Sequence, residues 1–578
     1  MKYKASDYIA EFIGAQKISH VFEVAGGMIT HILDSLHKRG QVNIISVHHE
    51  QAGAFAADAF GRITGKPGVA LATSGPGATN LLTGIAGCYF DSCPAIFITG
   101  QVNTHEQKGM KAIRQLGFQE TDIVSMALPI TKWAVQVERA EDLPSLLEQA
   151  YKISVSGRPG PVLIDIPMNI QRVQIECPPP VELFRERGLD TTKLENIDVL
   201  VNAIATAKRP LILAGGGVNA ARARASFLEF VALCQMPVVT SLLGLDLMPY
   251  DHPLRVGFIG SYGNRWANIA FAESDLLLVL GSRLDIRQTG ADTQAFAANK
   301  TIIHVDCDIG EINNRIPGCI PMVTDLQVFF DLFFAKTKAN LLSKFSCDDW
   351  IAYILKLKAQ WPDLNELKDV QGINPNVFIH ALSQSSQVAV GYSVDVGSHQ
   401  MWSAQSLEIL KSQLFVTSAG MGAMGYALPA AMGFSFACQK QPVVVIVGDG
   451  CLQMNIQELQ TIVRNQLPIK IIVLNNQSLG MIRQFQDSYF DSRYQSTYWG
   501  YSAPNFEAVA QAYGITAKTI SQDNEIHDAM HWLWADPKQP ALLQVMIEPS
   551  LHVYPKIAFG RPITDMEPFV KPLEMEGT

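Results

Sequence analysis

The chain has 578 residues; at about 150 residues per domain, this length predicts three or four domains. Its 45 Lys and Arg residues against 54 Asp and Glu give a formal charge of −9, which argues against a nucleic-acid-binding protein, because phosphate recognition needs a basic surface. Charged residues make up only 17% of the chain, below the ~25% usual for soluble domains, yet no apolar run approaches the ~20 residues that span a bilayer. The low charge therefore indicates surface buried between subunits, and we expect neither a membrane nor a nucleic-acid partner.

The N-terminus and the cysteines indicate the cellular compartment of the protein. The first residues, Met1 to Asp7, lead into an amphipathic helical pattern without the apolar core of a signal peptide. The nine cysteines are scattered and form no C-x-x-C pair, which is typical of free thiols in a reducing compartment. We therefore expect a cytoplasmic protein without a zinc site.

Short apolar strands alternate with helical stretches along the chain, a pattern that predicts parallel α/β layers. A proline-rich break at Cys177-Pro178-Pro179-Pro180 and a polar stretch over roughly 341–374 interrupt it. We expect three doubly wound parallel-sheet domains over residues 1–178, 190–340 and 372–552, followed by a C-terminal tail, 553–578. Predicted strands lie at 95–99, 162–165, 211–214, 238–241, 276–280, 302–306, 414–417, 443–447 and 469–474.

The first and third domains show a weak internal similarity. In each, a glycine-containing turn (Thr73 to Gly77, and Thr417 to Gly422) precedes a helix of small residues, then a proline and an apolar strand. This order suggests a duplicated α/β domain whose two copies pair, with the middle domain between them in sequence.

Two glycine motifs in the third domain indicate different cofactors. The segment Gly420 to Gly425 fits the G-x-G-x-x-G of nicotinamide-binding domains, but that motif alone is weak evidence. Gly448-Asp449-Gly450 follows a buried strand, and Asn475-Asn476 follows the next one, 25 residues after Gly450. A right-handed crossover would bring these strand ends side by side. Asp449 and Asn476 would then offer hard oxygen ligands to a Mg²⁺ ion that holds a diphosphate.

With this pair, the sequence resembles the thiamin-diphosphate-dependent enzymes and, among them, most closely the acetolactate (acetohydroxyacid) synthase catalytic subunits. The resemblance extends over nearly the whole chain. The matching blocks of the first and third domains are His49 to Gly53, Ala57 to Arg62, Thr64 to Lys66, Ala72 to Asn80, Thr99 to Val102, Phe118 to Asp122, Gly157 to Val162, Asp395 to Trp402 and Gly425 to Ala431.

The resemblance implies a role for each site residue. Glu50 would be the carboxyl group that protonates the aminopyrimidine of thiamin diphosphate, and Gln101 and Phe118 would lie near the reacting carbon. Mg²⁺ would be held by Asp449, Asn476 and the carbonyl of Ser478. Further cofactor contacts would come from Gly26, Val396, Gly397, Ser398, His399, Gly422, Met424, Gly448, Gly450, Cys451 and Met481.

The middle domain resembles the part of these synthases that binds FAD without a redox role. Its matching blocks are Gly215-Gly216-Gly217, Gly260 to Gly263, Gly281 to Arg287 and His304 to Asp308. The implied flavin contacts are Arg158, Gly215, Gly216, Gly217, Gly281, Arg283, Asp285, Arg287, Asp306 and Asp325.

The sequence departs from the synthases where the substrate binds. Phe485 replaces the tryptophan that favours 2-ketobutyrate over pyruvate as acceptor, and Ser478 replaces a histidine. A pocket change of this size shifts selectivity by only ~1–3 kcal/mol, but it could also admit a bulkier acceptor.

We therefore expect a transferase that decarboxylates pyruvate and transfers the two-carbon unit to a second 2-ketoacid, as in branched-chain amino acid biosynthesis. Alternatives are a carboligase that uses another carbonyl acceptor, such as a keto-sugar, a flavin-linked pyruvate oxidase, and a homologue without activity. The resemblance also implies an obligate homodimer or homotetramer, in which Glu50 comes from one chain and Asp449 and Asn476 from another, and a regulatory subunit as a further partner.

Overall fold

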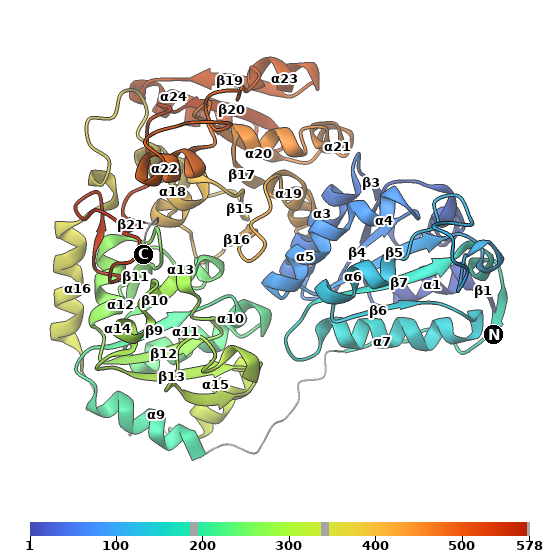
Figure 1. Ribbon diagram of the computed structural model, residues 1–578, viewed down its shortest axis with the longest axis horizontal. Coiled ribbons are helices and arrows are strands. Elements are labelled where there is room, and N and C mark those ends of the chain that lie inside the picture. Colours follow the sequence, from blue (N-terminus) through green and yellow to red (C-terminus); the bar gives the residue numbers. More distant parts are fainter. Residues whose placement is uncertain (185–194, 337–345, 575–578) are drawn as a thin grey trace.

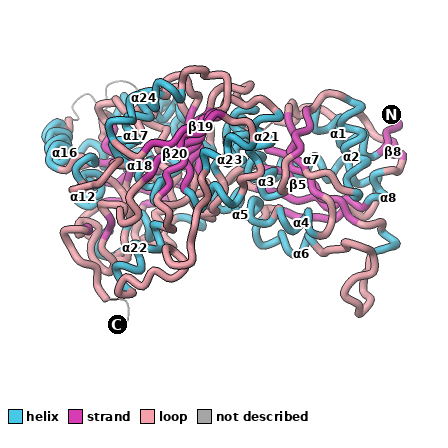
Figure 2. Tube along the Cα trace, turned by 90° about the horizontal axis from the view of Figure 1, so that it is seen from above, coloured by secondary structure: helices cyan, strands magenta, loops and turns pink. Residues whose placement is uncertain are grey.

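The computed structural model describes residues 1–184, 195–336 and 346–574. Within these ranges the chain forms three six-stranded sheets, and every strand pair inside them is parallel. Figure 1 shows the N-terminal sheet at one end of the molecule, and the middle and C-terminal sheets together at the other; the view in Figure 2 agrees. This arrangement confirms the expected α/β fold with three doubly wound sheets.

The N-terminal sheet has the strand order β3-β2-β4-β5-β7-β6. Its strands are β2 (His20–Glu23), β3 (Asn43–Ser46), β4 (Gly68–Ala72), β5 (Ala95–Gln101), β6 (Trp133–Gln136) and β7 (Pro161–Pro167). The helices of this part are α1 (Ala5–Ala15), α2 (Thr30–Arg39), α3 (Glu50–Thr64), α4 (Pro76–Asn80), α5 (Leu82–Asp91), α6 (Ile123–Ala127), α7 (Leu143–Val155) and α8 (Met168–Gln171). The first and last strands of this domain, β1 (Lys2–Lys4) and β8 (Gln174–Glu176), form a separate antiparallel pair.

The C-terminal sheet repeats that topology. Its order is β16-β15-β17-β18-β20-β19, with β15 (Gly391–Val394), β16 (Leu414–Thr417), β17 (Val443–Gly448), β18 (Ile469–Asn475), β19 (Thr516–Ile520) and β20 (Ala541–Met546). Its helices are α17 (Pro375–Ser385), α18 (Ser398–Ser406), α19 (Ala427–Ala437), α20 (Asp449–Met454), α21 (Glu458–Arg464), α22 (Gly480–Tyr489), α23 (Phe506–Ala512) and α24 (Ile526–Leu533). In both sheets the second strand along the chain lies at the edge, next to the first, so the weak similarity in sequence corresponds to an identical strand order.

The middle sheet has a different order, β11-β10-β9-β12-β13-β14, which is the order of dinucleotide-binding domains. Its strands are β9 (Pro210–Ala214), β10 (Val238–Thr240), β11 (Arg255–Phe258), β12 (Leu276–Leu280), β13 (Thr301–Asp306) and β14 (Ile320–Val323). The helices around it are α9 (Glu195–Thr206), α10 (Gly217–Ala220), α11 (Arg224–Cys234), α12 (Arg265–Glu273), α13 (Ile286–Thr289), α14 (Thr293–Ala297), α15 (Leu326–Lys336) and α16 (Asp348–Gln360).

The predicted domain limits stay predictions. The limits at 190 and 340 and the last residues of the tail lie outside the described ranges. The polar stretch at 341–374 is more than a linker, since it contains α16, whose Trp350 and Ile354 are buried in the apolar core of the middle domain.

The N-terminal and C-terminal domains of one chain share a continuous apolar core. Helices α3 and α19 meet through small residues: a Cβ atom built on Gly433 would lie 1.9 Å from the carbonyl oxygen of Ala56. Glycine therefore allows the backbones to touch. This contact fixes how the two similar domains of a chain sit together.

Candidate functional site

The topological switch point of the C-terminal sheet carries the predicted diphosphate site. Strands β15 and β17 are adjacent there, and ligands of open α/β sheets bind beyond the carboxyl ends of such strands. Asp395, directly after β15, accepts hydrogen bonds from the backbone N–H groups of Val396 (2.9 Å), Gly425 (3.0 Å) and Ala427 (2.7 Å). One buried carboxylate thus joins two of the predicted cofactor-binding turns.

The predicted metal ligands come together at the next strand pair. Strands β17 and β18 are parallel neighbours, with Gly448 opposite Leu474, so Asp449 and Asn476 follow neighbouring strand ends. The Asn476 Oδ1 atom accepts the Ser478 N–H at 3.2 Å, and the Ser478 backbone also lies close enough to Asp449 to lower the pKa of its carboxyl group.

The Asp449 carboxylate is suited to a cation. Burial raises its pKa to about 6 despite contacts from Tyr501 and from backbone N–H groups that lower it. Its Oδ2 atom is buried and has no hydrogen-bond partner among the described residues. A buried carboxylate oxygen without a partner is costly, and a Mg²⁺ ion coordinated to Asp449, Asn476 and Ser478 would remove that cost. These donors fit the predicted ion.

His399 offers a second atom without a partner. Burial lowers the pKa of its imidazole to about 3, so the ring is neutral at physiological pH. The ring packs against Gly397 and Gly448, where a Cβ atom would come within 2.7 and 2.8 Å of it. Its Nε2 atom is buried without a hydrogen-bond partner within the described part of the chain. A diphosphate oxygen is the kind of acceptor that a neutral imidazole N–H would bind here.

Asp395, His399 and Cys451 also lie close enough for a metal, with their ligand atoms within 4.8 Å of one another. Their contacts favour another explanation. The Asp395 oxygens already accept three backbone N–H groups, and the Cys451 thiol donates to the Val396 carbonyl at 3.0 Å. We attribute this cluster to the architecture of the turns.

The turn that contains Gly422 and Met424 is held from the N-terminal domain. Gly422 has a φ of +63°, a left-handed conformation that favours glycine. Two residues before it, Gly420 donates its N–H to Asp91 at 2.7 Å, and Ala419 does so at 3.0 Å. The Met424 methyl group lies 3.3 Å from where a Cβ of Gly450 would be, so the predicted apolar support adjoins the G-D-G turn.

The remaining predicted catalytic residues lie in the N-terminal domain. Glu50 is the first residue of α3 and is half-buried. Its Oε2 atom accepts a hydrogen bond from Asn80 at 2.9 Å, and its Oε1 atom faces Gly77. Gly26, just beyond β2, lies against Thr73, which follows β4. These residues mark the switch point of the N-terminal sheet, since β2 and β4 are adjacent there.

Gln101 and Phe118 differ in exposure. Gln101 is buried, and its amide donates to the Thr121 carbonyl (2.8 Å) and to Asp165 (3.0 Å). Phe118 is 80% exposed, which is unusual for a large apolar side chain and leaves its ring available to another surface. Glu50 and Gln101 thus both belong to the N-terminal domain, whereas Asp449 follows β17 of the C-terminal domain.

A cavity of about 1090 Å³ connects the C-terminal domain to the middle domain. Its lining includes Val396, Gly422 and Met481 of the predicted thiamin site and Phe485 of the predicted acceptor wall. It also includes many of the predicted flavin contacts: Arg158, Gly216, Gly217, Gly281, Arg283, Asp285, Arg287, Asp306 and Asp325. Glu50, Gln101 and Phe118 are not part of this lining.

The glycines of the middle domain lie at its own switch point. Strands β9 and β12 are neighbours, and the turns after them touch: the Gly217 N–H donates to the Gly281 carbonyl at 3.0 Å, and Gly215 donates to Leu280 at 2.9 Å. A Cβ atom on Gly217 would lie 2.6 Å from the Cα of Gly281. Glycine therefore lets the two turns pack against each other. Gly217 and Gly281 also line the cavity, where the predicted flavin would meet them.

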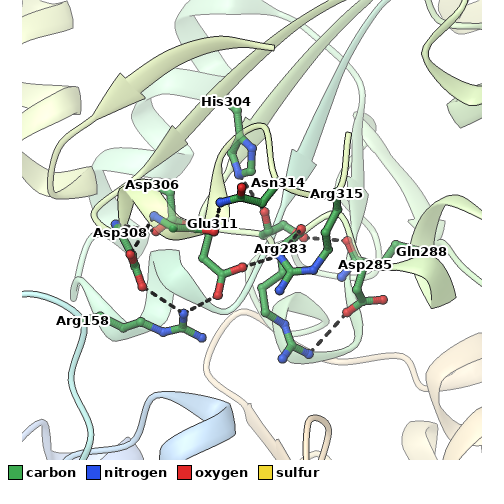
Figure 3. Close-up of polar contacts among 12 residues, drawn as sticks. Arg158, Arg283, Asp285, Gln288, His304, Asp306, Asp308, Glu311, Asn314 and Arg315 are labelled. Carbon is green, nitrogen blue, oxygen red and sulfur yellow. Dashed lines mark hydrogen bonds and ion pairs between the residues drawn. The ribbon is translucent and has the colours of Figure 1, made fainter. Parts of the chain in front are cut away.

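Figure 3 shows the polar groups at the same end of the cavity. Arg158 pairs with Glu311 and, at 3.3 Å, with Asp308, while its Nε donates to Ser92 at 2.8 Å. Arg283 pairs with Asp285 at 3.3 Å. Burial raises the pKa of Asp306 to about 6. The Arg158 guanidinium group is therefore already paired with two carboxylates. To bind a flavin phosphate, it would have to give up these ion pairs.

Comparisons with known protein families identify the family to which the chain belongs. It matches the thiamine pyrophosphate enzyme family in all three parts: the N-terminal TPP binding domain over residues 3–126, the central domain over 197–332 and the C-terminal TPP binding domain over 395–545. The chain belongs to this family of thiamin-diphosphate-dependent enzymes. None of the helices in the described ranges is long and apolar enough to cross a membrane.

Comparison with individual relatives identifies the kind of enzyme within this family. The acetolactate synthase large subunit of Corynebacterium glutamicum is 35% identical over 552 residues, covering 95% of this chain and 87% of the relative. That of Porphyra purpurea is 37% identical, covering 96% and 94%. The acetolactate synthase isozyme 2 large subunit of Escherichia coli is 34% identical, covering 97% and 98%. The chain is an acetolactate synthase-like, thiamin-diphosphate-dependent carboligase.

Several residues that hold the predicted site residues in position were not identified in the sequence analysis. Asp165 fixes the Gln101 amide, and Asp91 holds the turn before Gly422; both follow apolar segments and look like ordinary ends of a strand and a helix. Tyr501 lies next to the predicted metal ligand Asp449, with its hydroxyl 3.2 Å from a Cβ built on Gly450. No local pattern identifies such contacts, because each joins segments far apart in the chain.

Proposed function

We propose that the enzyme decarboxylates pyruvate and ligates the remaining two-carbon unit to a second 2-ketoacid, giving 2-acetolactate when that acceptor is pyruvate. The main support for this proposal is the cavity, because the predicted thiamin-binding residues Val396, Gly422 and Met481 line it together with the aromatic side chain of Phe485. The names of the relatives support the same product. One CO₂ leaves, one carbon–carbon bond forms, and the acceptor carbonyl oxygen gains a proton, so no oxidant is needed.

Thiamin diphosphate and Mg²⁺ would be held at the carboxyl ends of β15, β17 and β18. When bound, the cofactor supplies a nucleophilic carbon that accepts the electrons of the decarboxylated bond. The chain's part is to position it: Asp449, Asn476 and the Ser478 carbonyl bind the ion, and the neutral His399 and the N–H groups of α18 face the diphosphate. Gly422 and Met424 shape the pocket for the two rings.

Glu50 would supply the proton that activates the aminopyrimidine. The hydrogen bond from Asn80 fixes the orientation of its carboxyl group, and positioned acid–base groups contribute about 10²–10⁴ to turnover. Glu50 lies in the N-terminal domain at the switch point of its sheet, and we propose that it serves the site of a partner chain, as the resemblance to the synthases implies. The working enzyme would then be an obligate homodimer or homotetramer, and the exposed Phe118 would be covered in it.

FAD would occupy the middle-domain end of the cavity in a structural role. The strand order, the touching glycine turns and the size of the cavity support this assignment. Because several relatives are named large subunits, a regulatory subunit is part of the proposal. A cytoplasmic location also stays a proposal, supported by nine cysteines that are all unpaired.

A second acceptor class has one observation in its favour. Phe485 is 36% exposed and lies at the aromatic wall of the cavity, where it leaves more room than a tryptophan would. The acceptor could therefore be bulkier than a ketoacid, for example a keto-sugar.

The test is a product analysis with pyruvate as the only donor, in the presence of thiamin diphosphate, Mg²⁺ and FAD. Adding equal amounts of pyruvate and 2-ketobutyrate should give both acetolactate and 2-aceto-2-hydroxybutyrate, without a strong preference for the latter. Release of CO₂ with no ligated product from either acceptor would rule the proposal out. Anaerobic bleaching of bound flavin by pyruvate would instead indicate the oxidase alternative.

A further inference from the structure

The aromatic-rich segment Tyr494 to Tyr501, which follows α22, docks on the turn that carries the predicted metal ligands. The carbonyl oxygen of its buried Thr497 accepts hydrogen bonds from the Ser478 hydroxyl at 2.9 Å and from the Leu479 N–H at 3.0 Å. The Thr497 hydroxyl donates to Gln486 of α22. Thr497 therefore fixes the segment both to this turn and to the helix that follows it.

Ser478 takes part in this contact with its side chain, although only its backbone carbonyl is a predicted metal ligand. It is also one of the positions at which the sequence departs from the synthases, where a histidine stands. In this chain the serine hydroxyl is bound to the Thr497 carbonyl. One residue thus links the predicted metal site to the segment.

The segment then turns back and brings Tyr501 to the G-D-G turn. The Tyr501 N–H donates to the Tyr498 carbonyl at 3.3 Å. Gly500, between them, has a φ of +76°, a left-handed conformation that favours glycine. The Tyr501 hydroxyl lies 3.2 Å from where a Cβ atom of Gly450 would be, and so reaches the immediate neighbour of Asp449.

The Tyr501 hydroxyl and the Asp449 carboxylate are buried next to each other. Within the described residues, neither the hydroxyl oxygen nor the Asp449 Oδ2 atom makes a hydrogen bond of standard geometry. Burial raises the pKa of Asp449, and the hydroxyl opposes that rise; burial and then the Asp449 carboxylate raise the pKa of Tyr501. The tyrosine therefore keeps its proton at physiological pH, and an ionised carboxylate can only accept it.

Gln453, the other polar side chain near the hydroxyl, does not compete for that proton. Its amide donates to the Asp449 backbone carbonyl at 3.2 Å, and it opposes the rise in the pKa of Tyr501. A group that donates to a phenol oxygen has this effect, because it stabilises the ionised form. The Gln453 amide therefore acts as a donor, and the hydroxyl proton stays available to Asp449.

We propose that Tyr501 is a positioning residue of the metal site: its hydroxyl donates to the Asp449 carboxylate and fixes the orientation in which that carboxylate binds the ion. The contact between Ser478 and Thr497 holds Tyr501 in place. This inference rests on the proposed Mg²⁺ site and names the groups outside its ligand set that determine its affinity. Such outer groups are typically worth 10- to 100-fold in metal affinity.

The test measures metal binding directly, with Mn²⁺ as the probe, because it takes the same oxygen ligands as Mg²⁺. The complete enzyme is titrated with Mn²⁺ at saturating thiamin diphosphate, without a ketoacid, and the free ion is followed by its EPR signal. Tyr501→Phe keeps the ring and removes the hydroxyl, so the Kd for Mn²⁺ should rise about 10- to 100-fold with an unchanged melting temperature. The Mg²⁺ concentration for half-maximal rate should rise in parallel, while kcat at saturating Mg²⁺ changes much less.

Ser478→Ala tests how Tyr501 is held, because it removes the hydroxyl and keeps the carbonyl ligand. Losing one hydrogen bond of ~0.5–1.5 kcal/mol should raise the Kd for Mn²⁺ about 2- to 13-fold. In the Tyr501→Phe background the same change should have a smaller effect, since Ser478 acts through Tyr501. Tyr498→Phe is the matched control: Tyr498 belongs to the same segment, is 45% exposed and packs its ring 5.0 Å from the Arg483 guanidinium carbon.

Three results would overturn the proposal: an unchanged Kd for Mn²⁺ in Tyr501→Phe, an equal rise in Tyr498→Phe, or an effect of Ser478→Ala that is the same in both backgrounds. The second would assign the effect to the segment as a whole, and the third would separate Ser478 from Tyr501. Failure of the proposed Mg²⁺ site itself looks different, because Asp449→Ala would then bind Mn²⁺ as tightly as the wild type.

Discussion

A buried ion-pair network between the N-terminal and C-terminal domains gives the most quantitative prediction. Arg62 bonds both oxygens of Asp58, at 2.5 and 3.1 Å, one oxygen of Asp91 at 3.0 Å, and the Thr417 carbonyl at 3.1 Å. The side chains of Asp58 and Asp91 are only 1% and 0% exposed. Replacing Arg62 by alanine would therefore leave two buried carboxylates without their counter-ion.

The expected cost follows from that geometry. Removing one partner of a buried ion pair typically destabilises a protein by about 3–5 kcal/mol. In a domain of this size 1 kcal/mol corresponds to roughly 2–4 °C, so Arg62→Ala should lower the melting temperature of the N-terminal domain by roughly 6–20 °C. Since Asp91 also holds the backbone of Ala419 and Gly420, the affinity for thiamin diphosphate should fall as well.

Differential scanning calorimetry and thiamin diphosphate titration check both effects. Arg62→Lys is the control, because a lysine keeps the charge but cannot bond both carboxylates and Thr417 at once, and its loss should be intermediate. Neutralising both acids in the Arg62→Ala background, with Asp58→Asn and Asp91→Asn, should recover part of the stability. A shift below about 3 °C for Arg62→Ala would contradict the reasoning, since it would mean that the network contributes less than ~1 kcal/mol.

Three further variants test separate parts of the site. Glu50→Gln should reduce turnover by roughly 10²–10⁴-fold with an unchanged melting temperature, and a wild-type rate would remove Glu50 from the mechanism. Phe485→Trp should raise the preference for 2-ketobutyrate over pyruvate by ~1–3 kcal/mol, measured as the ratio of the two products; an unchanged ratio would show that this wall does not contact the acceptor. Burial raises the pKa of Asp165 to about 6, so the unfolded state loses its proton at lower pH than the folded state, and wild-type stability relative to Asp165→Asn should decrease as the pH rises from 4 to 6. A difference in urea unfolding free energy that does not vary over this range would argue against the raised pKa.

Much of the fold could be predicted from the sequence because its strands are short, buried and continuous in apolar residues. The strand predicted at 276–280 matches β12, and those predicted at 443–447 and 469–474 match β17 and β18 to within one residue. The turn motifs after β17 and β18 also led to Asp449 and Asn476, since the side-by-side placement of these strand ends follows from right-handed crossover geometry.

What could not be predicted depends on contacts between distant segments. The docking of the tail on Ser261 through the Ile557 N–H and the links from Asp91 to Gly420 and from Asp165 to Gln101 leave no periodic signal in sequence. The helix within 341–374 was missed because its polar face dominates the composition, although Trp350 and Ile354 are buried. The strand order shared by the first and third sheets was only suggested by two similar turns, and it is established by the pairing of the strands.

The central claim is that Glu50 and Asp449 serve one reaction although they lie in different domains of the chain. Complementation tests it most directly: Glu50→Gln and Asp449→Ala chains are coexpressed with different tags, and acetolactate formation from pyruvate is measured on the purified mixture. Random pairing makes about half of the dimers hybrids, each with one intact site of two, so activity should return to about a quarter of the wild-type value while each variant alone stays inactive. A mixture that remains as inactive as its components would contradict the account.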